Sequence, residues 1–209
     1  MSSQPADAAM TSAAAEGLVT DEHRVARCWW CGEDPGYVDY HDREWGVPVH
    51  DDVRLFEKLC LEGFQAGLSW LTILRKRPAF REAFHGFDPD EVAAFGPDDV
   101  ARLLGDARIV RHRGKIEATI ANARAFQDLV AQHDSLAAFV WRFAPDPPPP
   151  APRRIADVPA TTAEATALSR ELKRRGWRFV GPTTVYAFMQ AMGLVDDHLA
   201  GCDFRRAPT

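Results

Sequence analysis

The sequence predicts an all-α fold built from many short helices. From Asp51 onward, apolar residues recur at spacings of three and four, and capping residues and prolines separate these stretches. No segment shows the sustained alternation of polar and β-branched residues that is typical of a strand. The chain has 209 residues, 46% of them hydrophobic and 26% charged, as in an ordinary globular protein. No window approaches the roughly 20 apolar residues that a membrane-spanning helix needs.

The first predicted helix begins at Asp51 or Asp52 and runs to about Gly63. Leu55 and Leu59 lie one turn apart on its apolar stripe, so we expect this face in the core. Prolines at early helical positions and the same apolar periodicity predict several further helices. These cover residues 66–75, 79–84, 89–95, 97–104, 114–132 and 135–143.

Two more helices are predicted in the C-terminal part of the chain. Thr161 and Glu164 have the spacing of a capping box in front of an apolar stripe. The last helix covers residues 183–192, and Gly193 follows it as the residue that ends it. Residues 145–152 contain too many prolines for a helix interior. We interpret this segment as a stiff surface connector rather than as a boundary between two lobes.

Residues 1–22 are rich in alanine and serine and are predicted to form a disordered tail. They lack the basic start and the continuous apolar stretch of a signal peptide. Four cysteines are too few for a disulfide scaffold, which favours a reducing compartment. We therefore expect a cytoplasmic protein, monomeric by default, with one domain over residues 23–209.

The overall charge does not indicate a nucleic-acid-binding protein. The chain carries 25 basic and 30 acidic residues, a net charge of −5. Basic residues nevertheless gather in residues 101–126 and 169–178. Each cluster alone is typical of a solvated face, but two in one small domain modestly favour a polyanionic partner. Residues 106–115 form a short basic connection between two predicted helices, and the backbone amides at the second helix's start could bind a phosphate.

Cysteine and histidine residues gather near both ends of the predicted domain. They are Cys28, Cys31, His41, His198 and Cys202. Two ligands from each end would form a tetrahedral structural zinc site with no open position for water. His198 and Cys202 are four residues apart, so one helical turn would place them on the same face. The spacing leaves Cys31 and His41 as alternatives, and scattered cysteines and histidines without a metal are the other explanation.

Aromatic residues are unusually dense between residues 29 and 70. They are Trp29, Trp30, Tyr37, Tyr40, Trp45, Phe56, Phe64 and Trp70. Core packing explains Phe56, which lies on the apolar stripe of the first helix. Tryptophan and tyrosine also stack against flat ligands, including nucleic-acid bases. The cluster therefore predicts either a core or a pocket for a flat ring.

Glu62 is out of place on the first predicted helix. It lies three residues after Leu59 and therefore on the apolar stripe, where a carboxylate is unfavourable unless it is paired or used. A buried ion pair with an arginine is the structural explanation. The aromatic neighbours and the flanking Gly63 and Gly67, which allow close approach, favour a functional role. Cys60 lies on the same apolar stripe and is interpreted as a core residue.

These residues occur in a set of ordered motifs that spans residues 27 to about 204. The motifs are Arg27-Cys28, Tyr37, YHDREWGVP at 40–48, CLEGFQAGLSW at 60–70, RHRGKI at 111–116, FVG at 179–181, FMQA at 188–191 and residues 193–202. In this respect the chain resembles the DNA-3-methyladenine glycosylase I family. That family contains bacterial base-excision repair enzymes of the helix-hairpin-helix superfamily.

The resemblance implies a base pocket, a zinc site and a DNA-binding hairpin. It implies that Glu62 recognises the base and that the pocket is formed by Trp30, Tyr37, Tyr40 and Trp70. It implies a structural zinc held by Cys28, His41, His198 and Cys202. It also implies that residues 106–115 grip DNA, with contacts from Leu68, Arg111, Arg113, Gly114 and Lys115. Arg108 departs from the glycine expected at that position of the hairpin.

The activity implied by the resemblance is hydrolytic release of 3-methyladenine from alkylated double-stranded DNA. The enzyme would be a monofunctional N-glycosylase that flips the damaged base out of the helix, and free 3-methyladenine would be the product. Two alternatives remain from the residues themselves. One is a zinc-stabilised helical module that binds damaged DNA without cleaving it, and the other is a metalloenzyme with an open zinc site.

Overall fold

The computed structural model describes residues 17–206, and its regular structure is almost entirely helical, which confirms the predicted fold class. The strands and α-helices are, in chain order, β1 Leu18–Thr20, β2 Ala26–Cys28, α2 Pro35–Arg43, α3 Asp52–Gln65, α4 Trp70–Ala83, α5 Pro89–Ala93, α6 Pro97–Gly105, α7 Arg113–His133, α8 Leu136–Val140, α9 Ala163–Arg174 and α10 Pro182–Ala191. Short 3₁₀ turns lie at Trp29–Cys31, His85–Phe87, Trp141–Phe143 and Ile155–Asp157. Within the described residues, no helix is both long enough and apolar enough to cross a bilayer.

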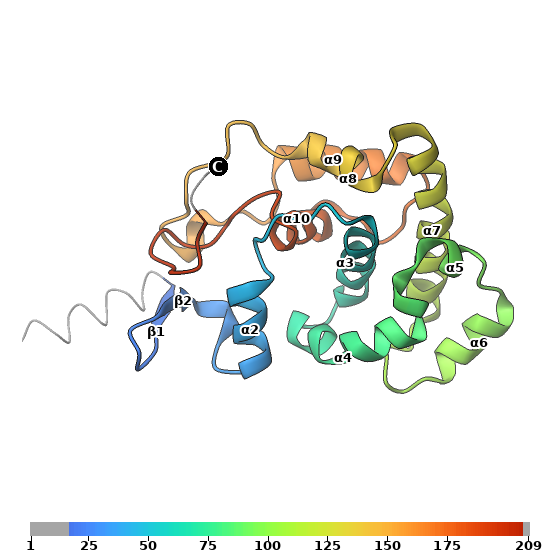
Figure 1. Cartoon of the computed structure of the whole chain (residues 1–209), viewed down its shortest axis with the longest axis horizontal. Helices are drawn as coiled ribbons and strands as arrows, with labels where there is room; N and C mark the ends of the chain where they lie inside the picture. Colours follow the sequence, from blue (N-terminus) through green and yellow to red (C-terminus); the bar gives the residue numbers. More distant parts are fainter. Residues whose placement is uncertain (1–16, 207–209) are drawn as a thin grey trace, which may run out of the picture.

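Helix α3 runs through the middle of the molecule (Figure 1) and contacts α4, α7, α8 and α10. Asp51 caps it, since its carboxylate accepts a hydrogen bond from the Arg54 backbone N–H at 2.8 Å. Leu55 and Leu59 are buried, as the apolar stripe predicts. The other helices surround this axis, with α8 and α9 on one side and α4 to α6 on the other. The helices packed around α3 therefore fix the positions of the side chains on this helix.

Helix α4 differs from the prediction at both ends. The separate helices expected over 66–75 and 79–84 form one continuous helix, which contains Pro78 in its interior. It begins later than predicted because Gly67 adopts a φ of +84°, which turns the chain. Ser69 then caps the helix by accepting a hydrogen bond at 3.2 Å from the backbone of its first turn. The residues between α3 and α4 are left as an exposed turn.

The N-terminal part contains structure that the sequence patterns did not predict. Strands β1 and β2 pair antiparallel, with Leu18 opposite Cys28, so the predicted tail of residues 1–22 includes an ordered strand. The expected disorder of residues 1–16 lies outside the described residues. Helix α2 was also missed, although Asp34 caps it by accepting a hydrogen bond from the Tyr37 backbone at 3.0 Å. Each strand has only three residues, too few for a visible alternation pattern.

The C-terminal helices largely follow the sequence. Thr162, rather than the predicted Thr161, caps α9. Gly193 follows α10 with a φ of +73°, as expected for the residue that ends a helix. Beyond it the chain returns to the N-terminal strands, where the Asp203 backbone N–H donates to the Ala26 carbonyl at 2.9 Å. The first and last parts of the described chain are therefore held together.

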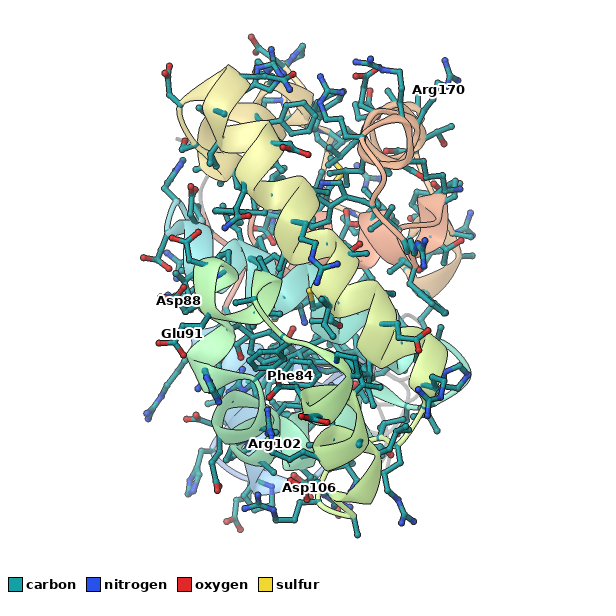
Figure 2. All side chains as sticks on the ribbon, turned by 90° about the vertical axis from the view of Figure 1, so that its right-hand side faces the viewer. Phe84, Asp88, Glu91, Arg102, Asp106 and Arg170 are labelled. Atoms are coloured by element: carbon teal, nitrogen blue, oxygen red, sulfur yellow. The ribbon has the colours of Figure 1, made fainter. Side chains whose placement is uncertain are left out.

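A stack of phenylalanine rings fills the space between α3 and the helices α4 to α6. Figure 2 shows Phe84 in the interior of the molecule, and its ring lies 5.3 Å from that of Phe87 and 5.9 Å from that of Phe64. All three side chains are fully buried. Aromatic packing of this kind joins α3 to the segment between α4 and α5.

Candidate functional site

A cavity of about 250 Å³ opens between α2, α3 and α10. Glu62 and all four of the aromatic residues assigned to the pocket from the sequence lie on its wall. The lining residues are Trp29, Trp30, Tyr37, Tyr40, Trp45, Glu62, Gln65, Trp70, Val158, Ala187, Gln190 and Asp197. The walls are thus mostly aromatic, with a few polar groups among them, which is the usual composition of a site for a flat heterocycle.

Aromatic rings from three separate segments form the walls of this cavity. The Trp30 ring centroid lies 5.1 Å from that of Tyr37 and 4.9 Å from that of Trp45. On the α4 side, the rings of Tyr40 and Trp70 are 5.5 Å apart. The Trp70 indole N–H is buried and lacks a hydrogen-bond partner among the described residues. Burial raises the pKa of Tyr37 to about 12, so its hydroxyl is protonated at neutral pH.

Glu62 is buried, with 5% of its surface exposed, and it forms an ion pair inside the protein. Its partner is a lysine rather than an arginine: Lys58 Nζ lies 2.8 Å from Glu62 Oε1, one helical turn earlier on α3. The same ammonium donates to the Tyr40 hydroxyl at 2.8 Å. Glu62 is therefore ion-paired and also lies on the wall of the cavity, so the two explanations considered from the sequence apply together.

The second group of predicted residues meets at the junction of the two ends of the domain. Donor atoms of Cys28, His41 and Cys202 lie within 4.8 Å of one another, and all three residues are buried. Cys31 is not part of this group, and its thiol donates instead to the Cys28 carbonyl at 3.2 Å. The geometry thus brings His41, rather than Cys31, to the cluster. The neighbouring Cys28 thiol donates to the Cys202 sulfur, and this hydrogen bond lowers the pKa of Cys202 and raises the pKa of Cys28.

His198 lies beside this cluster, with its ring centroid 4.9 Å from that of His41. Its Nε2 atom is buried and has no hydrogen-bond partner within residues 17–206. The other ring nitrogen is 2.7 Å from Asp196 Oδ1, and Nδ1 of His41 is likewise 2.7 Å from Asp42 Oδ1. The helical turn predicted for His198 and Cys202 is absent, since this segment is irregular.

The third group of predicted residues surrounds two exposed turns. Leu68 lies on the turn between α3 and α4, and 43% of its side chain is exposed. Arg111 and Arg113 are exposed on the connection between α6 and α7. Arg108, in contrast, is neutralised by ion pairs with Asp106 at 2.9 Å and Glu82 at 2.8 Å. Arg113 forms a longer ion pair with Glu117, at 3.4 Å, so within the described residues Arg111 is the exposed arginine of this connection that has no ion pair.

Comparison with known proteins identifies the family. Residues 30–206 match the family model described as methyladenine glycosylase. The chain belongs to the methyladenine glycosylase family. It is 51% identical to DNA-3-methyladenine glycosylase 1 of Escherichia coli (strain K12) over 179 residues, which cover 85% of this chain and 96% of the relative.

Further relatives of this methyladenine glycosylase agree. The DNA-3-methyladenine glycosylase of Haemophilus influenzae is 48% identical over 181 residues, covering 85% of this chain and 97% of the relative. A crystal structure of a tyrosine-to-phenylalanine variant of 3-methyladenine DNA glycosylase I, in complex with 3-methyladenine, is 38% identical with a TM-score of 0.83. It covers 86% of this chain and 97% of that chain.

One predicted DNA contact of this methyladenine glycosylase needs correction. Lys115 was expected to bind DNA, but its side chain is buried. Its ammonium donates to the backbone carbonyls of Phe64, in the last turn of α3, at 2.8 Å and of Ala66, the residue that caps this helix, at 2.6 Å. A lysine at this position stabilises the helix end and satisfies its free carbonyl groups. Lys115 thus joins the hairpin to the turn that carries Leu68 instead of reaching the surface.

Sequence reasoning missed several residues of the glycosylase pocket. Gln65, Gln190 and Asp197 line the cavity but were not assigned to it. Gln190 Nε2 donates to Asp197 Oδ2 at 2.8 Å, and the Tyr186 hydroxyl donates to the same oxygen. The motifs at 188–191 and 193–202 contain two of these residues, but no spacing rule relates α10 to α3. Lys58 was visible in principle, because it lies four residues before Glu62.

Proposed function

We propose that the protein is a monofunctional N-glycosylase that releases 3-methyladenine from alkylated double-stranded DNA. The observation that carries this proposal is the buried carboxylate of Glu62 on the wall of a small aromatic cavity. Adenine methylated at N3 within DNA is a flat cation. Aromatic walls attract such a ring by stacking and by cation–π contact, and a carboxylate accepts a hydrogen bond from its exocyclic amine.

For this reaction the protein has mainly to extrude the base from the DNA helix and to bind it. Because the methylated base is already cationic, it leaves without protonation by an acid. Water attacks the sugar carbon, the C–N bond breaks, and its electron pair neutralises the departing base, while the water proton passes to solvent. Glu62 accepts from the exocyclic amine in this scheme and is a base-recognition residue rather than a nucleophile. Trp30, Tyr37, Tyr40 and Trp70 stack against the ring.

The relative crystallised with 3-methyladenine supports this assignment, because its fold matches over 86% of the present chain. The DNA substrate and the four reduced cysteines agree with a cytoplasmic location. The predicted monomeric state also remains part of the proposal. A glycosylase of this kind binds one extruded nucleotide at a time and needs no second copy to complete the pocket described above.

We further propose that the exposed turns around α3 and α7 hold the DNA. Arg111 and Arg113 contact phosphates, and Gly114 at the start of α7 lets a phosphate approach the backbone amides. Leu68 enters the space left by the extruded base, which suits an apolar side chain on an exposed turn. Lys115 supports this arrangement from inside. The name helix-hairpin-helix for α6, residues 106–112 and α7 follows from this proposal.

We also propose a structural zinc at the cysteine–histidine cluster, held by Cys28, His41, His198 and Cys202. The support is the unpartnered, buried Nε2 of His198 and the convergence of buried donor atoms from Cys28, His41 and Cys202. Asp42 and Asp196 orient the two imidazoles from behind, as carboxylates do for metal-bound histidines. Four protein ligands would stabilise the fold and leave no open position for water.

Replacing Glu62 tests the main proposal. We expect Glu62→Gln to reduce release of 3-methyladenine from duplex DNA treated with a methylating agent by at least tenfold, because the variant keeps the shape but loses the charge. Free bases are separated by chromatography. Glu57→Gln is the matched control, since Glu57 lies on the same helix and pairs with Arg81 at 2.8 Å, away from the cavity.

Three results of this experiment have distinct meanings. Normal release by Glu62→Gln would contradict the role assigned to that carboxylate. Tight binding of alkylated DNA by the wild-type protein without any base release would replace the glycosylase with a damage-binding module. Release of 7-methylguanine alongside 3-methyladenine would show that the activity is not specific for 3-methyladenine.

A further inference from the structure

Lys58 is a buried cation that the proposed mechanism does not use. Its side chain is 6% exposed, and its ammonium lies behind the wall of the base cavity. The nitrogen sits 2.8 Å from Glu62 Oε1, 2.8 Å from the Tyr40 hydroxyl and 3.1 Å from the centroid of the Trp70 ring. Its three nearest partners are therefore all residues of the cavity wall.

The charges around Lys58 leave it as the direct counter-ion of Glu62. The nearby Glu44 and Arg77 neutralise each other through two hydrogen bonds of 2.6 Å. On the same helix, Glu57 is paired with Arg81. Burial lowers the pKa of Lys58 to about 8, while the Glu62 carboxylate opposes that effect. At neutral pH the ammonium and the carboxylate thus cancel within one turn of α3.

We propose that Lys58 sets the charge selectivity of the base pocket by cancelling the negative charge of Glu62. This inference rests on the proposed function. A carboxylate alone in an aromatic cavity would strongly favour a cationic ring over a neutral ring of the same shape. With the ammonium beside it, Glu62 adds no net negative charge to the pocket, and Asp197 remains as the other carboxylate of the lining. The ring is then read by its shape and by its hydrogen-bonding edge.

The pairing of Lys58 with Glu62 suits a reaction in which the charge of the base changes. The base enters the pocket as a cation and becomes neutral when the glycosidic bond breaks and its electron pair moves onto the ring. A negatively charged pocket would stabilise the cationic substrate and so oppose the change in charge. Lys58 makes the preference of the pocket for the cationic substrate over the neutral product smaller, because its ammonium repels a cationic ring while leaving a neutral ring unaffected. The lysine thereby acts as a specificity-determining residue that works through Glu62.

Affinities for two small ligands test the proposal directly. The probes are neutral 3-methyladenine and the fixed cation 3,9-dimethyladeninium, and binding at pH 7.5 is followed by quenching of tryptophan fluorescence. The measured quantity is the ratio of the two dissociation constants. We expect Lys58→Met, which preserves side-chain length, to shift this ratio by roughly tenfold in favour of the cation, the effect of one nearby charge at intermediate polarity.

Three further variants make the result specific. Glu62→Gln should shift the ratio in the opposite direction, because it leaves the ammonium alone. The double variant Lys58→Met/Glu62→Gln should return the ratio close to the wild-type value. Lys173→Met, an exposed lysine on α9, is the control for loss of a positive charge elsewhere. Lys58→Gln provides a second test of the same position if Lys58→Met folds poorly.

The possible failures are distinguishable. If both Lys58 variants keep the wild-type ratio, or if the double variant does not restore it, Lys58 does not set charge selectivity, although the proposed function stands. If the folded wild-type protein binds neither ligand, the proposed function fails and this inference fails with it. A role of Lys58 in stability alone would change the unfolding temperature without moving the ratio.

Discussion

At the scale of single residues, Lys58 carries a testable effect on stability. Burial lowers its pKa in the folded protein from 10.5 to about 8. Between these two values the unfolded chain holds more protons, so the free energy of unfolding rises with pH. Relative to Lys58→Met, wild-type stability should increase by about 2 kcal/mol between pH 7 and pH 9.5. Urea unfolding at each pH measures this difference.

The wild type and the Lys58→Met variant share all other titrating groups. The effects of those groups therefore cancel in the difference between the two free energies of unfolding. A difference that is independent of pH would mean that Lys58 keeps its ordinary pKa in the folded state. A difference that falls as pH rises would mean that the Glu62 carboxylate outweighs burial and raises that pKa instead. Either result would change how the charge of the pocket is described.

Residue-level prediction succeeded where periodicity applies and failed where it does not. Glu62 could be found because a carboxylate on an apolar stripe is a local contradiction visible in the sequence. Its partner Lys58 could also have been predicted from the four-residue spacing, although the partner expected from the sequence was an arginine. Asp197 could not be found, because it meets the pocket only through the packing of α10 against α3.

At the scale of elements, the connection between α6 and α7 is predicted to bind phosphate through few charges. Arg108 forms two ion pairs within the protein, and the Lys115 ammonium donates hydrogen bonds to two backbone carbonyl groups. We expect Arg111→Ala/Arg113→Ala to weaken binding of duplex DNA and to reduce the salt dependence of log Kd by about 2, or about 0.9 per phosphate contact. Fluorescence anisotropy over a series of salt concentrations measures both quantities.

A matched control for this hairpin is Arg170→Ala on α9. Figure 2 places Arg170 and Asp106 at opposite ends of the molecule. At these positions, the basic segments 101–126 and 169–178 therefore do not form one continuous surface. Arg170 is also exposed, which makes it comparable to Arg111. An equal loss of salt dependence in the control would point to a nonspecific effect of charge. An unchanged slope in the double variant would remove the hairpin from the proposed interface.

The elements themselves show why local patterns predict some helices better than others. Helix α3 begins as expected because Asp51 caps it and its apolar residues are regularly spaced. Helix α4 was divided in the prediction at Pro78, but the helix continues through this exposed proline, and Ile73 and Phe80 on either side of it are buried in the core. Helix α2 is short and its residues serve the pocket and the cluster more than a core stripe. On α2 only Tyr40 and His41 are buried, and both belong to the candidate sites described above.

At the scale of the whole molecule, the cysteine–histidine cluster should matter for folding rather than for chemistry. Removing zinc with a chelator is expected to lower the unfolding temperature by roughly 10 °C or more, because metal binding of this kind contributes directly to folding. Cys202→Ala should show the same effect and lose the metal. Cys31→Ala is the control and should keep one zinc per chain, measured by atomic absorption.

An unchanged metal content in Cys202→Ala would contradict the assigned ligand set. Loss of zinc from Cys31→Ala would reopen the alternative in which Cys31 replaces His41. If chelation abolished base release while the unfolding temperature stayed constant, the site would be an open catalytic zinc instead of a structural one. Metal-free protein that releases base normally while folded would agree with the structural role.

The hydrogen bond between Asp203 and Ala26 also bears on how the gene could be rearranged. Because the described ends of the chain lie together, a short linker could join residue 206 to residue 17, and new termini could open within the exposed prolines at 147–150. In such a circular permutant, Cys28, His41, His198 and Cys202 would all fall on one continuous stretch of sequence. A site that now requires nearly the whole chain would then become a local motif, able to assemble early in synthesis and to be transplanted as a unit.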